Sequence, residues 1–345
     1  MEKKYAGIAA PLLRWFAQNK RDLPWRQDKE PYHVWISEIM LQQTRIEAVM
    51  KYYARFMEAL PDVQSLSAVA DDTLLKLWEG LGYYSRARNL KKAAQAIMTD
   101  YGGVFPDNYE ALRRLAGIGD YTAGAIASIC FGERVPAVDG NVLRVLSRLT
   151  GSRDNVLLPE TKKAVTADLR AVMPEQAGDF NEALMELGET VCLPNGFPLC
   201  GECPLREQCT AYRQNLTAEL PVRIKKQKRR REDKTVLLLI ADDGDIALEK
   251  RPDSGLLSGM YQLPNIEGFL EEAALRETLT SRDLRPSEIV FLRETKHVFT
   301  HIDWFMRGWR VRVHHKPEGF LWVSPRELQE NYALPTAFRK LLKES

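Results

Sequence analysis

The chain reads Leu-Ala-Gly-Ile-Gly-Asp-Tyr-Thr-Ala from residue 115 to residue 123 and, after an apolar run, Val138-Asp-Gly-Asn141. The first part places two glycines between apolar segments, which is typical of a turn whose backbone N–H groups can hold a phosphate. The second part places Asp139, 18 residues after Tyr121, at the start of a new helical pattern. A phosphate-binding turn followed by a single carboxylate indicates chemistry on a nucleic acid.

The two glycines, Gly117 and Gly119, separate one apolar helical pattern from a second that is rich in small residues, 122–131. An ordinary turn between two helices would use the same residues. Within this apolar frame, the turn resembles a helix-hairpin-helix motif. We therefore expect the N–H groups that open the second helix to bind the DNA backbone.

Composition limits the class of protein. The chain has 345 residues, enough for two or three domains with separate cores. Its longest apolar run, Val236 to Ala241, is too short to cross a bilayer, and the first residues lack the apolar core of a signal peptide. We expect a cytoplasmic protein that does not bind membranes and whose five cysteines are not paired in disulfides.

Charge and apolar spacing divide the chain near residue 225. The net charge is +2, but residues 1–222 sum to −2, and the run Arg223–Arg231 adds seven positive charges. Apolar spacing before this run is helical, and strand-like runs at 236–241, 289–292 and 309–314 follow it. The sequence predicts an all-α domain over 1–215, a basic linker over 216–234 and an α+β domain over 235–345. The linker is either a solvated charge run or a DNA contact.

Four cysteines lie within 18 residues, at Cys192, Cys200, Cys203 and Cys209. The intervening Pro and Gly residues prevent a helix, so the four thiolates can converge on one centre. A set of cysteines without histidine fits either a [4Fe–4S] cluster or a Cys₄ zinc site. Cys130 lies apart from them in an apolar helical pattern and is expected to be a small core residue.

Two carboxylates are candidates for acid–base chemistry. Glu38 lies among apolar neighbours in a helical pattern over 33–44, so desolvation should raise its pKa toward the range of a general acid. The alternative for Glu38 is a solvated helix residue. Asp139 is in the position of an ordinary N-cap, and capping is compatible with catalysis because N–H donors favour an ionised carboxylate.

Together these features resemble the MutY-type adenine DNA glycosylases of the helix-hairpin-helix, endonuclease III-like superfamily. The matching motifs span nearly all of residues 8–212: Leu23-Pro-Trp-Arg26, Pro31-Tyr32, Glu38-Ile-Met-Leu-Gln-Gln-Thr44, Gly80-Leu-Gly-Tyr-Tyr-Ser-Arg86, the glycine turn, Val138-Asp-Gly-Asn141 and the four cysteines. The second domain resembles the Nudix-type domain of that family through 255–264 and His297-Val-Phe-Thr-His301.

The resemblance implies a substrate, a cofactor and a setting. The substrate would be double-stranded DNA in which adenine is mispaired with 8-oxoguanine or guanine, and the reaction would begin base excision repair. The four cysteines would hold a [4Fe–4S] cluster. The enzyme would be a monomer associated with a bacterial nucleoid.

The resemblance also assigns roles residue by residue. Glu38 would protonate adenine N7 and later help to activate water, while Asp139, oriented by Asn141, would stay ionised beside an oxocarbenium-like sugar. The positions that match the pocket for the flipped-out adenine are Arg26 and Glu182. The positions beside 8-oxoguanine are Gln42, Gln43, Thr44, Leu81 and Tyr83, and the lesion-reading loop of the second domain is Phe299, Thr300 and His301.

Tyr121 distinguishes close relatives within this superfamily. The bifunctional endonuclease III branch has at that position a lysine that forms a Schiff base and cuts the strand. A phenol cannot form an imine with the C1′ aldehyde. We therefore expect base release without an efficient lyase step, with Tyr121 hydrogen-bonding within the catalytic carboxylate group.

The chain departs from the family pattern in three places. The first cysteine gap is seven residues where the family has six, and Thr300 stands where the family often has serine. No Glu-Glu-x-Gly follows Arg276-Glu277, so we expect the second domain to read DNA and not to hydrolyse pyrophosphates. Its histidines at 297, 301, 314 and 315 are expected at the lesion or on the surface, although a zinc site is conceivable.

Two other functions compete with adenine removal. One is an endonuclease III-like enzyme acting on oxidised pyrimidines. The other is a non-catalytic iron–sulfur DNA-binding protein or redox sensor, in which Glu38 and Asp139 would be dispensable.

Overall fold

The computed structural model describes residues 4–224, 229–252 and 254–342, and the chain forms two compact units. The first unit comprises Met1–Ala68 and Asn89–Lys226, and the second comprises Val69–Arg88 and Gln227–Ser345. Residues 225–228 of the basic run lie outside the described residues. None of the described helices combines the length and the apolar character that a membrane span requires.

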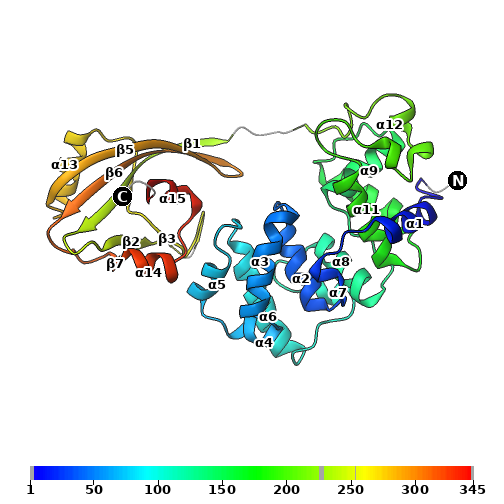
Figure 1. Cartoon of the computed structure of the whole chain (residues 1–345), viewed down its shortest axis with the longest axis horizontal. Coiled ribbons are helices and arrows are strands. Elements are labelled where there is room, and N and C mark those ends of the chain that lie inside the picture. The colour runs from blue at the N-terminus through cyan, green and yellow to red at the C-terminus, as the bar shows by residue number, and fades with distance from the viewer. Residues whose placement is uncertain (1–3, 225–228, 253, 343–345) are drawn as a thin grey trace. The chain divides into compact units, whose positions relative to one another are not determined.

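The first unit is built from helices (Figure 1). These are α1 (Ala9–Asn19), α2 (Pro31–Leu41), α3 (Ile46–Ala59), α4 (Val63–Ala68), most of α6 (Ser85–Asp100), α7 (Tyr109–Leu112), α8 (Asp120–Phe131), α9 (Gly140–Thr150), α10 (Pro159–Arg170), α11 (Ala177–Thr190) and α12 (Thr210–Arg213). Apolar residues spaced three or four apart on α1, α9 and α11 form a shared core, with Leu12, Leu146 and Leu184 fully buried. The predicted all-α architecture of this part is confirmed.

Two helices of this unit, α2 and α8, are buried along most of their length. Their sequences are apolar or small on every side, as expected for helices enclosed by neighbours. Gly124 in α8 shows how tight this packing is, because a Cβ there would lie 2.5 Å from the carbonyl oxygen of Pro136. A polar side chain on the buried faces of α2 or α8, such as Glu38, is therefore desolvated.

The predicted hairpin is formed by α7, the glycine turn and α8. Gly117 adopts a φ of 76°, in the left-handed region, and a Cβ there would meet the Asn89 side chain at 2.6 Å. Gly119 has extended backbone with a φ of −87° and serves as the N-cap of α8. Only one of the two glycines therefore needs positive φ, while the other leaves the first N–H groups of α8 uncovered by a side chain.

The second unit contains a seven-stranded mixed sheet (Figure 1). Its strands are β1 (Arg230–Ala241), β2 (Ile246–Lys250), β3 (Tyr261–Gln262), β4 (Asn265–Glu267), β5 (Pro286–Val298), β6 (Ile302–Val313) and β7 (Leu321–Val323). The order is β3-β2-β1-β6-β5, with β4 paired to β1 and β7 paired to β2. Strands β1 and β6 run parallel from Arg230 opposite Ile302 to Ala241 opposite Val313, while β5 and β6 form an antiparallel hairpin.

Helices cover both faces of this sheet. Alternate residues of β1 point to opposite faces, so Leu238 packs with α14 (Pro325–Glu330) and α15 (Thr336–Leu342), and Leu239 packs with α13 (Glu272–Ser281). The short α5 (Asp71–Leu77) also belongs to this unit. The three predicted strand runs and the α+β class are confirmed.

Three boundaries differ from the sequence-based expectations. Strand β1 begins at Arg230, inside the predicted linker, because its first residues pair with β6. Helix α2 ends at Leu41, and Gln43 has a φ of 62°, so residues 42–44 form a turn after the helix. Residues Val69–Arg88, which the prediction put in the all-α domain, are grouped with the second unit by their contacts, although α6 continues across this boundary into the first unit.

Candidate active site

A cavity of about 990 Å³ lies in the first unit, between α2, the start of α8, the start of α9 and α11. Eleven of the predicted site residues line it: Arg26, Glu38, Gln42, Gln43, Thr44, Gly117, Gly119, Tyr121, Asp139, Asn141 and Glu182. These residues span more than 150 positions of sequence, and the fold brings them to one place. The predicted residues of the second unit are described separately below, because they belong to a different part of the chain.

Glu38 is a buried carboxyl group in the middle of α2. Its residue is 7% exposed, and its Oε2 atom has no hydrogen-bond partner. Burial raises the pKa of Glu38 to about 7, against a lowering influence of the Tyr121 hydroxyl. The expectation of a raised pKa is confirmed. A carboxyl group that is half-protonated near neutral pH and has one oxygen without a hydrogen-bond partner can donate a proton to a ligand in the cavity.

Asp139 is the N-cap of α9. Its Oδ1 accepts from the backbone N–H of Val142 at 2.7 Å, and its Oδ2 accepts from Nδ2 of Asn141 at 2.9 Å. Burial nevertheless raises the pKa of Asp139 above its usual value, and these two hydrogen bonds only partly offset the effect. The expectation that capping alone would favour the ionised form is therefore incomplete. A positive charge nearby would bring the pKa of Asp139 down again.

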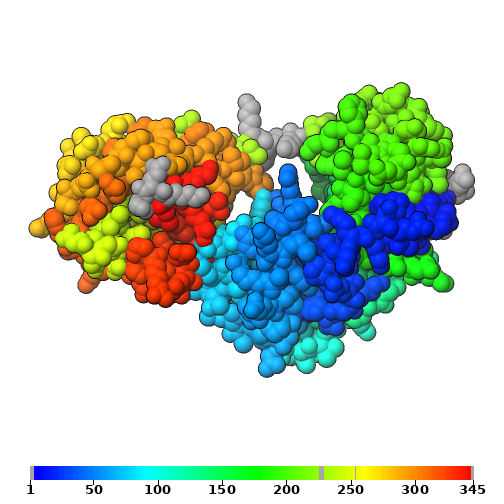
Figure 2. Space-filling view, viewed as in Figure 1, coloured from blue at the N-terminus to red at the C-terminus, as the bar shows by residue number. Residues whose placement is uncertain are grey.

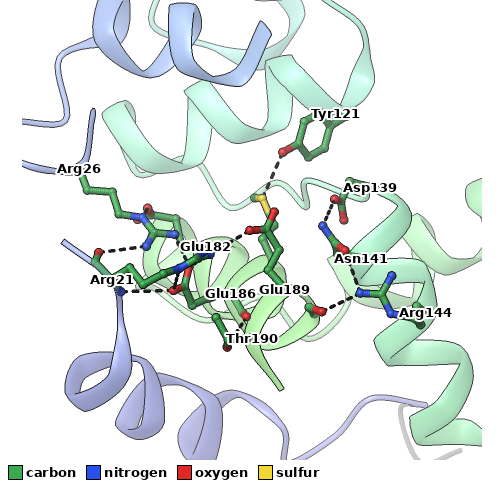
Figure 3. A network of polar contacts seen from close by, with 12 residues as sticks. Arg21, Arg26, Tyr121, Asp139, Asn141, Arg144, Glu182, Glu186, Glu189 and Thr190 are labelled. Carbon is green, nitrogen blue, oxygen red and sulfur yellow. Dashed lines mark hydrogen bonds and ion pairs between the residues drawn. The ribbon is translucent and has the colours of Figure 1, made fainter. Parts of the chain in front are cut away.

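Asn141 is in turn hydrogen-bonded by Arg144, as Figure 3 shows. Arg144 donates through Nη2 to Oδ1 of Asn141 at 2.8 Å and to the carbonyl oxygen of Gly188 at 2.7 Å. A Cβ at Gly188 would lie 2.7 Å from Cβ of Asn141, so α11 and α9 pack here without a side chain between them. Arg144 also donates to the carbonyl oxygen of Cys192 at 2.8 Å, which ties the Asp139–Asn141 pair to the first cysteine of the loop.

Tyr121 lies in the first turn of α8 and reaches into the same cavity. Its hydroxyl donates to the sulfur of Met185 at 3.1 Å (Figure 3). Burial raises the pKa of Tyr121, and the negative charges of Glu38 and Asp139 raise it further. The phenol is therefore neutral, and it lowers the pKa of the neighbouring Glu38.

A network of arginines and carboxylates forms another wall of the cavity (Figure 3). Arg26 pairs with Glu182 at 2.7 Å and with Glu186 at 2.9 Å, and Arg21 pairs with Glu186 at 2.6 Å and with Glu189 at 2.9 Å. Burial raises the pKa of Glu182. Burial also acts to raise the pKa of Glu186, but hydrogen bonds from both arginines outweigh it and lower that pKa.

Three members of this network were not predicted from the sequence: Arg21, Glu186 and Glu189. The three glutamates of α11 are spaced four and three residues apart, which places them on one helical face. That periodicity was the available signal. It did not reveal which arginines would face them, since Arg21 and Arg26 come from a distant part of the chain.

The turn after α2 adds polar groups to the rim. Gln42 donates through Nε2 to Oγ1 of Thr122 at 3.4 Å, which attaches the turn to α8. Gln43 and Thr44 line the same cavity. The left-handed backbone of Gln43 lets the chain leave α2 sharply, so these side chains lie at the end of the helix that carries Glu38.

The predicted residues of the second unit gather around the β5–β6 hairpin. Phe299, Thr300 and His301 form its loop, and the ring of Phe299 lies 4.8 Å from that of Trp304. The hydroxyl of Tyr83 lies 3.3 Å from Oγ1 of Thr300. Tyr83 is 47% exposed, whereas Leu81 is buried.

The four predicted cysteine ligands line one small cavity of about 30 Å³, with apolar walls that include Val145 and Leu149. Arg148, which is buried, donates through Nη1 to Sγ of Cys192 at 3.3 Å. Among the residues that the structure describes, no three His, Cys, Asp or Glu side chains are grouped closely enough for one metal ion. Four thiols around one cavity, with a buried cation beside them, fit an anionic iron–sulfur cluster, which has one thiolate on each iron.

In the second unit, the sequence that was compared with a Nudix motif, around Arg276, lies on α13. Arg276 on α13 pairs with Glu272 at 3.3 Å, one turn earlier on the same helix. His314 contacts Asp242 at 3.0 Å, and the ring of His297 packs on Phe299 at 4.6 Å. His314 thus lies on the surface, and His297 lies beside the hairpin loop.

Comparisons with known proteins agree on both units. Residues 36–175 match the family described as HhH-GPD superfamily base excision DNA repair protein, and residues 235–344 match the NUDIX domain family. The adenine DNA glycosylase of Mus musculus is 35% identical, over 96% of this chain and 76% of that protein. The adenine DNA glycosylase of Buchnera aphidicola subsp. Baizongia pistaciae is 33% identical, over 84% of this chain and 82% of that protein.

Solved structures resemble the helical part. A thermostable thymine-DNA glycosylase aligns with a TM-score of 0.56 and 29% identity, over 61% of this chain and 98% of that chain. An endonuclease III in a non-covalent DNA complex aligns with a TM-score of 0.52 and 25% identity, over 63% of this chain and 99% of that chain.

Proposed function

The chain belongs to the adenine DNA glycosylases of the HhH-GPD superfamily, and on that basis we propose that it removes adenine paired with 8-oxoguanine or guanine by hydrolysis, without cutting the strand. Membership itself makes the chain a DNA glycosylase of base excision repair. The mispair, the roles of the residues and the cofactor are the proposal. The observation that supports this proposal most directly is that Glu38 and Asp139 line the same cavity.

Glu38 is proposed as the general acid. Its unpartnered Oε2 and its pKa of about 7 make a proton available where adenine N7 would enter the cavity. Protonation at N7 converts adenine into a leaving group, and the electrons of the N-glycosidic bond leave with the base. Once Glu38 is ionised it can accept a proton from the incoming water. Arg26 and Glu182 supply hydrogen-bonding groups for the flipped-out base.

Asp139 is proposed as the partner of the sugar cation. As the bond breaks, positive charge develops on the sugar, which lowers the pKa of Asp139 and favours its ionised form. Asn141, held by Arg144, fixes the orientation of the carboxylate in advance. The same fold therefore holds one carboxyl group protonated and the other ionised at the time each is needed.

The cofactor that the family implies is a [4Fe–4S] cluster, and we propose Cys192, Cys200, Cys203 and Cys209 as its ligands. When bound, the cluster would serve as a structural element that fixes the loop from Cys192 to Cys209. The link from Cys192 through Arg144 to Asn141 supports a mechanical role, because the loop and the Asp139 cap share one hydrogen-bonded chain.

The substrate proposal is tested with duplexes that differ only in the base opposite adenine. We expect rapid adenine release opposite 8-oxoguanine, slower release opposite guanine and none opposite thymine, under single-turnover conditions. The reason is that a flipped-out adenine is the same in all three duplexes, so only the opposite base can discriminate. Release of oxidised pyrimidines in place of adenine would favour an endonuclease III-like enzyme instead.

The pH dependence of the chemical step should be bell-shaped. Glu38 must be protonated, so with its pKa at about 7 the rate constant should fall by about tenfold per pH unit on the alkaline side. Asp139 must be ionised, and since burial raises its pKa, activity should be lost on the acid side sooner than for an ordinary aspartate. Single-turnover rates across the pH range measure both limbs. A rate that keeps rising above neutral pH contradicts the role of Glu38.

The cluster proposal predicts iron and not zinc. The purified protein should be brown and contain about four irons per chain. Cys203→Ser should lose iron and lower the melting temperature, whereas Cys130→Ser, at a half-buried cysteine outside the loop, should keep its iron. Metal analysis and visible absorbance are the measurements. Stoichiometric zinc in a colourless protein would overturn the cluster.

A further inference from the structure

Residues Val69–Arg88, which we call the α5–α6 segment, form part of the second unit although the HhH-GPD match includes them. The segment contains α5 and the turn with Leu81 and Tyr83, two of the five positions expected beside the lesion. Residues near the C-terminus, red in Figure 2, contact this segment, as the hydrogen bond from Leu334 to Glu79 shows. The residues that make this contact are specific and polar.

Glu79 is the centre of the contact. Its side chain is 8% exposed and lies between two cations, Lys76 at 3.0 Å and the guanidinium of Arg339. It also accepts from the backbone N–H of Leu334 at 2.7 Å. A buried carboxylate is costly unless it is paired and hydrogen-bonded, so its contacts with Arg339 and Leu334 attach the segment to the residues around α15.

Two further attachments flank Glu79. Lys76 donates to the carbonyl oxygen of Tyr332, between α14 and α15, at 3.1 Å and to that of Leu328, within α14, at 3.4 Å. Arg88, at the other end of the segment, donates through Nη1 to Oγ of Ser258 at 2.9 Å. The segment is therefore tied to the sheet domain at Lys76 and at Arg88, with Leu81 and Tyr83 between them.

The same helix that receives Glu79 supports the lesion-reading loop. Phe338 of α15 packs against Trp304 with ring centroids 5.9 Å apart, and Trp304 packs against Phe299 at 4.8 Å. The loop then meets the segment again where Tyr83 lies 3.3 Å from Thr300. Glu79, α15, the aromatic stack and the loop thus form a continuous set of contacts within one unit.

We propose that Glu79 is a positioning residue for recognition of the base opposite adenine. It holds Leu81 and Tyr83 on the same body as the loop of Phe299, Thr300 and His301. The loop then contacts 8-oxoguanine at the same time as Leu81 and Tyr83 insert beside it. The favourable free energy of the contact between the loop and 8-oxoguanine therefore promotes insertion as well as recognition. This inference rests on the proposed function, since it concerns the preference for 8-oxoguanine over guanine.

The test compares two single-turnover rate constants, for adenine opposite 8-oxoguanine and for adenine opposite guanine. In Glu79→Gln the neutral amide can still accept from Leu334 but no longer attracts Lys76 and Arg339. We expect the ratio of the two rate constants to fall by about tenfold, the scale of a typical coupling between sites, mainly through the 8-oxoguanine substrate. Arg339→Met, which removes one of the two cations, should lower the ratio in the same direction.

The matched control is Glu330→Gln, which removes an exposed carboxylate from an ion pair with Arg326 in the same unit. It should leave the ratio unchanged. Active-site titration corrects each preparation for misfolded protein. An unchanged ratio in Glu79→Gln, or an equal loss on both substrates, overturns the inference. A wild-type enzyme that releases adenine opposite neither base would instead overturn the proposed function, whatever Glu79 does. Equal rates on both substrates in the wild type would overturn the inference.

Discussion

Glu38→Gln should lower the single-turnover rate constant for adenine release by about 10³-fold at neutral pH, the scale of a lost general acid. Glutamine has nearly the same shape as glutamate, so the packing of α2 is kept, but the amide cannot deliver a proton to adenine N7. Binding to DNA should change little, because the proton is needed only as the bond breaks. The measurement is release of adenine from a duplex with 8-oxoguanine, with enzyme in excess.

Stability provides a check on this variant. Since the folded-state pKa of Glu38 is raised to about 7, the folded protein is stabilised by the proton on Glu38 below the pKa of the unfolded state, and this contribution is lost as the pH rises through 7. The neutral glutamine should therefore not lower the melting temperature at alkaline pH. Glu58→Gln, on the exposed side of α3, is the matched control and should retain full activity. Full activity in Glu38→Gln would exclude Glu38 as the acid.

Asp139→Asn should lower the same rate constant by about 10²- to 10³-fold, the scale of a lost electrostatic group in the transition state. Asparagine is as good an N-cap as aspartate, so α9 should still begin at Gly140. What is lost is the negative charge beside the developing sugar cation. Melting temperature and DNA affinity should stay close to those of the wild type, which separates catalysis from folding.

A second capping aspartate serves as the control for this prediction. Asp62 accepts from the backbone N–H of Ser65 at 2.7 Å at the start of α4, and it is exposed. Asp62→Asn makes the same chemical change at a cap away from the cavity and should retain activity. If Asp139→Asn behaves like Asp62→Asn, then Asp139 is a structural cap and the proposed mechanism is wrong.

The parts of the site that were predictable from the sequence depend on local patterns. Glu38 has apolar neighbours along the chain, which was enough to predict its burial and raised pKa. Asp139 stands before a helical pattern, which was enough to predict the N-cap. At Asp139 the local pattern did not predict that burial outweighs the hydrogen bonds and raises the pKa, because burial depends on α11 and other elements that the local sequence does not identify.

The parts that were not predictable depend on contacts between distant segments. Arg21 and Glu186 are 165 positions apart, and no local pattern pairs them. Strand β1 begins at Arg230 because β6 offers hydrogen bonds there, and the basic composition of the run indicated a linker instead. The α5–α6 segment was assigned to the helical domain by its position in the chain, whereas Glu79 and Arg88 attach it to the second unit.

The state of the DNA strand tests the proposed function most directly, because the phenol of Tyr121 cannot form an imine. In that proposal, Glu38 and Asp139 catalyse hydrolysis of the N-glycosidic bond, and the strand stays intact. The measurement follows free adenine and strand cleavage in the same reaction, on a duplex with adenine opposite 8-oxoguanine, with and without alkali. We predict free adenine, an intact strand before alkali and full cleavage after it. Strand cleavage without alkali that matches adenine release, or an enzyme–DNA adduct trapped by borohydride, would contradict the account.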